Sequence, residues 1–107
     1  MGCVMGEWVT VAAAADVPDG EVVPARSGEV FLALVRDGDT VYALDDNCTH
    51  EECPLSDGIV TRSGITCFCH GSVFDVRTGE ALVGPALESV PTYAVRVVDG
   101  QVQVELG

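Results

Sequence analysis

The sequence predicts a small all-β domain of the antiparallel sandwich or barrel type. Short runs rich in valine, leucine and aromatic residues are separated by turn residues about every 8 to 12 positions, which is typical of such folds. No stretch has the periodicity of a long amphipathic helix. At 107 residues the chain is expected to form one domain, residues 1–107.

The N-terminal part predicts a strand followed by a hairpin. Residues 7–11 read Glu-Trp-Val-Thr-Val, an alternating pattern, and Trp8 is expected to lie in the core. Residues 29–36 and 40–44 are rich in β-branched and aromatic side chains, and they flank Asp37-Gly38, a turn signal.

The C-terminal part predicts shorter strands and a second hairpin. Strands are expected at residues 59–61, 64–67, 72–76, 93–98 and 101–106. The last two flank Asp99-Gly100, a hairpin signal. Because side chains alternate along a strand, Val102, Val104 and Leu106 are expected on one face.

The charge and the hydropathy pattern exclude several classes of partner. The net charge of −12 argues against binding to nucleic acid or to anionic membranes, and it favours a positively charged protein partner. The sequence contains no run of about 18 apolar residues that could span a membrane, and the N-terminus lacks the pattern of a signal peptide. A cytoplasmic location is therefore expected, where cysteines usually bind metals or serve redox chemistry.

Two short motifs between residues 45 and 78 predict a metal centre. Cys48-Thr-His50 and Cys67-Phe-Cys69-His70 contain both histidines of the chain, and each motif offers a thiolate and an imidazole. Zinc also accepts two cysteines and two histidines, but zinc fingers usually pair like ligands within one motif. One cysteine and one histidine in each motif favour a two-iron cluster, in which thiolates bind one iron and imidazoles bind the other.

These motifs resemble those of the Rieske iron–sulfur domain. The resemblance extends from about Trp8 to Leu106 and includes Pro54-Leu-Ser-Asp-Gly58, residues 74–79 and Val90-Pro91. It is strongest to the ferredoxin components of bacterial aromatic-ring dioxygenases. It implies the Rieske fold, with a cluster-binding subdomain at about residues 45–78 inserted in a β base domain.

The resemblance also implies the ligand set of a Rieske [2Fe–2S] cluster. By this resemblance Cys48 and Cys67 bind the inner iron, whereas His50 and His70 bind the outer iron near the surface. Phe68 stands where the family usually has a proline.

Cys53, Cys69 and Ser72 stand at positions that resemble those of the high-potential Rieske proteins of cytochrome bc complexes. In those proteins a pair at the positions of Cys53 and Cys69 forms a disulfide, so we expect one here; two free buried thiols are the alternative in a reducing cytoplasm. Ser72 is expected to donate its hydroxyl to a bridging sulfide. Pro85 resembles the proline of a loop that covers the cluster, although an ordinary turn remains an alternative.

The resemblance implies a monomeric one-electron carrier rather than an enzyme. Such a carrier takes electrons from an NAD(P)H-dependent ferredoxin reductase and passes them to the terminal oxygenase of an aromatic-ring-hydroxylating dioxygenase system, in the catabolism of aromatic hydrocarbons. One alternative is a small Rieske subunit of another oxidoreductase, arsenite-oxidase-like or nitrite-reductase-like. A structural zinc module is the other. With both histidines used as ligands, the chain has none left for acid–base catalysis.

Overall fold

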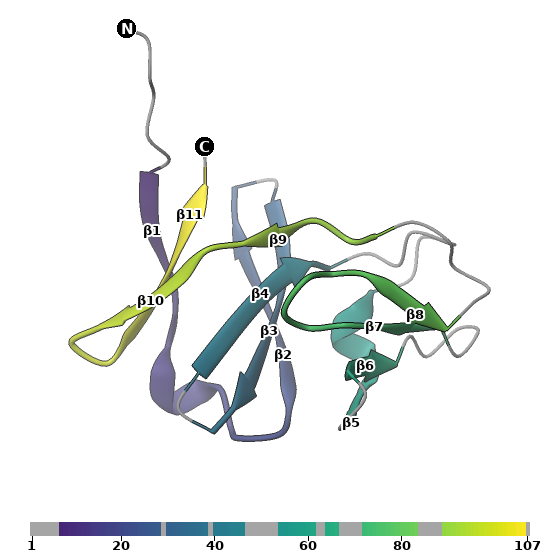
Figure 1. Ribbon diagram of the computed structural model, residues 1–107. Helices are drawn as coiled ribbons and strands as arrows, with labels where there is room; N and C mark the ends of the chain where they lie inside the picture. The colour runs from purple at the N-terminus through teal and green to yellow at the C-terminus, as the bar shows by residue number, and fades with distance from the viewer. Residues whose placement is uncertain are drawn as a thin grey trace, which may run out of the picture.

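The computed structural model describes residues 7–28, 30–38, 40–46, 54–61, 64–66, 72–83 and 89–106, which form three antiparallel sheets (Figure 1). The first sheet has the order β1-β11-β10, the second β2-β3-β4-β9 and the third β5-β6-β7-β8. The strands are β1 (Glu7–Ala13), β2 (Val22–Ser27), β3 (Val30–Asp37), β4 (Thr40–Asp45), β5 (Ile59–Thr61), β6 (Gly64–Thr66), β7 (Val73–Phe74), β8 (Ala81–Val83), β9 (Thr92–Tyr93), β10 (Val95–Val98) and β11 (Gln101–Leu106). Two short 3₁₀ helices, η1 (Ala14–Asp16) and η2 (Leu55–Asp57), complete the described elements. The predicted all-β class is therefore confirmed.

The first two sheets form the base of the molecule and share one core. Val102 and Val104 of β11 are fully buried in this core, and Leu106 packs against it, as the alternation of β11 predicts. From the second sheet, Leu32 and Leu34 of β3 enter the same core. The predicted turn at Asp99-Gly100 is confirmed, since both residues have positive φ angles (51° and 76°), which a tight two-residue hairpin requires.

The structure corrects the sequence prediction in several places. The strand predicted at residues 93–98 is divided between β9 and β10, which belong to different sheets. Strand β2 was not expected; it contains Pro24, which the sheet accommodates because β2 is an edge strand. Strand β8 at residues 81–83 was not expected either, and β7 is limited to two of the five residues predicted for it. Trp8 is half-buried rather than a core residue, because it alternates with Val9 and lies beneath the Arg96 guanidinium at 4.3 Å.

The third sheet packs against the base through a second core. Ile65 of β6 and Phe74 of β7 are fully buried there. From the base, Val35 of β3 and Leu44 of β4 join the same cluster, as does Leu55 of η2. This shared core fixes the third sheet to one side of the base, at the right of Figure 1.

The part of the chain that the structure describes contains no helix long and apolar enough to cross a membrane.

Candidate metal centre

One end of the third sheet brings together the described residues that flank both predicted ligand motifs. Thr66 ends β6 and Val73 begins β7, and the two pair directly, so segment 67–71 starts and finishes at neighbouring positions. Thr66 also pairs with Ile59, the first residue of β5, and Val73 pairs with Val83, the last residue of β8. The strand ends that flank residues 67–71 and 84–88 are thus adjacent.

The described residues that follow the first motif lie at the same end of the sheet. They include η2 and Gly58, and Gly58 packs so closely on β6 that an added Cβ would collide with the carbonyl oxygen of Thr66. Gly58 and Thr66, described residues that follow the first motif and precede the second, are therefore in close contact. The fold brings the anchors of both motifs to one edge although they are far apart in the sequence.

Asp46 and Ser56 clamp the two ends of the first segment together. The backbone N–H of Ser56 donates to Oδ1 of Asp46 at 2.7 Å, and the Ser56 hydroxyl donates to Oδ2 at 2.7 Å. Both hydrogen bonds are partly buried and the acceptor is a carboxylate, which makes each stronger than an exposed neutral one. The backbone N–H of Asp46 is itself held by the carbonyl of Phe31 at 2.9 Å.

Replacing Asp46 by alanine is expected to lower the free energy of unfolding by about 1.5–3 kcal/mol, because the Ser56 donors lose a charged acceptor. Urea unfolding of the apoprotein measures this change, and the iron content after gel filtration reports whether the metal centre loosens with it. The matched control is Asp57→Ala, which removes an exposed carboxylate from η2, the short helix that contains Ser56. Its free energy of unfolding is expected to stay within about 0.5 kcal/mol of the wild-type value. Equal losses for the two variants would contradict the clamp.

A second pair, Asp45 and Tyr93, connects the end of β4 to β9. The two side chains are hydrogen-bonded, and the backbone N–H of Asp45 donates to the carbonyl of Pro91 at 2.8 Å. Burial raises the pKa of Asp45 above its ordinary value of 3.8; the hydrogen bond from Tyr93 lowers it, and the charge of Asp46 raises it. Burial, followed by the charge of Asp45 and the hydrogen bond to it, raises the pKa of Tyr93 above 10.0.

The raised pKa of Asp45 predicts that the contribution of this residue to the free energy of unfolding falls as the pH rises above 3.8. The folded protein binds this proton more tightly than the unfolded chain, so the contribution is complete below the unfolded pKa and is lost through the folded pKa. Asp45→Asn should flatten the dependence of the free energy of unfolding on pH. Tyr93→Phe should steepen it, because the hydrogen bond that lowers the pKa of Asp45 is removed. Urea unfolding at several pH values between 4 and 7 checks both, and identical slopes in all three proteins would contradict this prediction.

Ser72 lies at the same end of the third sheet as Thr66 and Val73, whereas the turn after β7 lies at the opposite end. Ser72 is completely buried immediately before β7. After β7, the Asp75 carboxylate accepts the backbone N–H of Arg77 at 2.8 Å and shapes the turn that leads to Gly79. Gly79 has a φ of 76° and lies against the carbonyl of Val90, where a side chain would collide with the backbone. This contact anchors the chain where it leaves residues 84–88.

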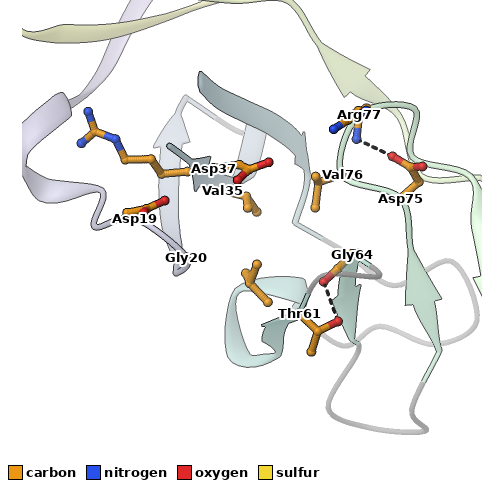
Figure 2. A pocket seen from close by; sticks show the side chains of 11 residues that line it. Asp19, Gly20, Val35, Asp37, Thr61, Gly64, Asp75, Val76 and Arg77 are labelled. Atoms are coloured by element: carbon orange, nitrogen blue, oxygen red, sulfur yellow. Dashed lines mark hydrogen bonds between the residues drawn. The ribbon is translucent and has the colours of Figure 1, made fainter. Parts of the chain in front are cut away.

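A polar groove of about 740 Å³ lies between the base and the opposite end of the third sheet (Figure 2). Asp19 and Arg36 line it from the base, while Thr61, Gly64 and Arg77 line it from the third sheet. Because Thr61 and Gly64 are at the far end of the β5–β6 pair from Ile59 and Thr66, this groove is separate from the predicted metal centre.

Most residues predicted for the site lie outside the described residues. These are Cys48, His50, Cys53, Cys67, Cys69, His70 and Pro85. Ser72 is described and is completely buried. The sequence reasoning missed Asp46 and Ser56; an acidic residue before the first motif and a serine after it are the only sequence signals of their pairing.

The chain belongs to the Rieske [2Fe–2S] domain family, whose model matches residues 7–94. Over 103 residues it is 34% identical to the anthranilate 1,2-dioxygenase ferredoxin subunit of Burkholderia cepacia, covering 96% of this chain and 95% of that protein. The ferredoxin of carbazole 1,9a-dioxygenase from Nocardioides aromaticivorans IC177 has a similar structure, with a TM-score of 0.88, 31% identity and coverage of 94% and 98% of the two chains. A chain in the complex of reduced oxygenase and oxidized ferredoxin of carbazole 1,9a-dioxygenase is also similar, with a TM-score of 0.84, 36% identity and 92% coverage of each chain.

The residues of this chain fit the [2Fe–2S] cluster of that family. Two thiols and two imidazoles are the donor set of a Rieske centre, and the chain supplies one of each in both motifs. The described strand ends bring the anchors of the two motifs to one edge of the third sheet. Family membership therefore confirms the predicted cluster type, and the zinc alternative is set aside.

Proposed function

We propose that this protein is a Rieske ferredoxin that carries single electrons from an NAD(P)H-dependent reductase to the terminal oxygenase of an aromatic-ring-hydroxylating dioxygenase system. The observation that carries the proposal is the similarity to dioxygenase ferredoxin components over almost the whole length of both chains. One of the similar structures is a complex between such a ferredoxin and its oxygenase, which supports the terminal oxygenase as partner. The protein is a transfer component and is not catalytic alone.

In this proposal Cys48 and Cys67 hold the inner iron, and His50 and His70 hold the outer iron. When bound, the cluster supplies a centre that accepts and releases one electron at a potential between about −150 and +300 mV. The two imidazoles are neutral, so they make the site less negative than four thiolates and favour acceptance of an electron. Ser72 and Phe74, which follow the second motif in the sequence, are both fully buried.

Ser72 is proposed to donate its hydroxyl toward a bridging sulfide and to stabilise the reduced state. Ser72→Ala should therefore lower the reduction potential, which protein-film voltammetry measures. The matched control is Ser56→Ala, whose hydroxyl is engaged by Asp46 and should leave the potential near the wild-type value. An unchanged potential in the Ser72 variant would refute its role. Ser72 matches the high-potential Rieske pattern, but Phe74 stands where that pattern has a tyrosine, so a second hydroxyl is missing. We therefore place the reduction potential above that of simple oxygenase ferredoxins and below that of respiratory Rieske proteins.

The remaining predictions from the sequence also belong to this proposal. Cys53 and Cys69 form a disulfide that joins the two ligand segments, and Pro85 belongs to a segment that covers the cluster. The chain is a single Rieske domain with its cluster-binding part at about residues 45–78, and it works as a monomer in the cytoplasm. Thiol titration of the denatured holoprotein tests the disulfide: with Cys48 and Cys67 released, three reactive thiols are expected rather than five.

Reconstitution with a ferredoxin reductase and an aromatic-ring dioxygenase tests the function. The purified brown protein should be reduced by NADH only when the reductase is present and should show the EPR spectrum of a reduced Rieske centre. Hydroxylation of the ring substrate should then depend on this protein. A protein that copurifies only as a fixed subunit of a larger oxidoreductase, and that no reductase reduces, would instead support the alternative of a small Rieske subunit.

A further inference from the structure

The outer face of the third sheet carries an apolar row next to the predicted metal centre. Ile59, Thr66 and Val73 pair across β5, β6 and β7. Leu82 follows on β8 at a register shift, where Val73 pairs with Val83, and we call these four residues the outer row. Ile59, Thr66 and Val73 are in register on adjacent strands, one residue away from neighbours that point into the core. Side chains alternate along a strand, so this row faces away from the base.

Two side chains of the outer row are unusually exposed for their size. Ile59 is 62% exposed and Leu82 is 46% exposed, whereas Thr66 and Val73 between them are half-buried. Strands lie about 4.8 Å apart, so a row across four strands extends for roughly 14 Å. An apolar strip of this length at the surface of a small protein indicates a contact site rather than a scattered exposed residue.

Carboxylates flank the outer row at both ends. Asp57 lies two residues before Ile59 and is exposed. Glu80 lies two residues before Leu82 and is exposed too, and Ala81 between them packs on the core. The net charge of −12 adds a negative field over the whole molecule. A complementary surface must therefore have an apolar centre and a positively charged rim.

We propose that the outer row is a docking surface for a redox partner protein that presents an apolar patch framed by lysine or arginine side chains. The proposal rests on the electron-carrier function proposed above and adds to it a binding surface on a sheet face rather than on the ligand segments alone. Charge complementarity would speed the encounter, and burial of Ile59 and Leu82 would hold the complex. The position of the row matters because Thr66 and Val73, at its centre, are the strand ends that flank residues 67–71.

Stopped-flow electron transfer to cytochrome c tests this surface, because cytochrome c is a basic redox protein with an exposed haem edge surrounded by lysines. Leu82→Ser and Ile59→Ser holoproteins should each transfer electrons about three- to five-fold more slowly than wild type at low salt, from the apolar area lost. The matched control is Val97→Ser on β10, because Val97 is 47% exposed but lies in a different sheet. Its rate should remain within about two-fold of wild type.

The charge of the rim is tested by salt and by Glu80→Gln. Rising ionic strength should slow the wild-type reaction, and Glu80→Gln should make it less sensitive to salt. The proposal is overturned if Leu82→Ser and Val97→Ser have equal effects, or if the wild-type rate does not depend on salt. It is also overturned if sizing shows that the outer row joins two copies of this chain. An unaltered EPR spectrum and potential in each variant separate this surface from the electron-carrier function, which fails only if the wild-type protein cannot be reduced and reoxidised.

Discussion

Replacing His70 by alanine is expected to abolish the [2Fe–2S] chromophore. The variant removes one of the two imidazoles that we assign to the outer iron, and the chain has no third histidine to replace it. The visible absorption, the acid-labile sulfide and the rhombic EPR spectrum of the reduced protein should all fall to near background. His50→Ala should have the same effect, because the two histidines serve one iron.

The matched control for the histidine variants is Cys3→Ser. Cys3 lies far from both motifs in the sequence, so its replacement should leave the iron content and the spectrum unchanged. Urea unfolding of the apoproteins should give similar stabilities for His70→Ala and wild type. A His70→Ala protein that keeps full absorption would refute the ligand assignment. If His70→Ala does not fold, the absorption of His50→Ala tests the assignment instead.

Replacing Phe74 by alanine should cost about 3–5 kcal/mol of unfolding free energy, the largest stability effect expected here. Phe74 is fully buried in the core shared by the third sheet and the base, and its removal leaves a cavity that the surrounding β-strands cannot readily fill. For a small domain this is a large share of the total stability of about 5–15 kcal/mol. Urea unfolding of the apoprotein measures the loss.

The matched control for Phe74 is Phe31→Ala. Phe31 is 52% exposed and contacts Arg26, whose guanidinium lies 4.9 Å from its ring centroid. Its replacement removes the same side chain without leaving a buried cavity, so the loss should be about 1 kcal/mol or less. Equal losses for Phe74 and Phe31 would show that the shared core does not couple the third sheet to the base.

The long strands of the base were predictable because each has a strong local signal. The alternation of β11 indicated which face of the strand is buried, and Asp99-Gly100 indicated the turn before it, as the structure confirms. Strand β2 was missed because Pro24 argues locally against a strand; only its position at the sheet edge makes the proline acceptable. Strand β8 was missed because its strand conformation depends on pairing with β7, which comes from tertiary structure.

The site shows the same division between local and long-range information. The spacing of two cysteines and two histidines predicted the cluster type, which the family confirms, while the assignment of Cys48, His50, Cys67 and His70 stays a prediction. The Asp46–Ser56 clamp was not predicted because the two residues are ten positions apart. Neither side chain has a sequence pattern that sets it apart from an ordinary polar residue in a loop.

The core that Phe74 shares with Val35 and Leu44 has a consequence for how the protein exchanges electrons. Because the described strands of the third sheet share this core with the base, we do not expect the sheet to swing from one partner to another while the base stays in place. We therefore expect the whole molecule to dissociate from its electron donor and diffuse to its acceptor. Complexes that are too tight would then slow turnover, so brief contacts suit this carrier better than lasting ones.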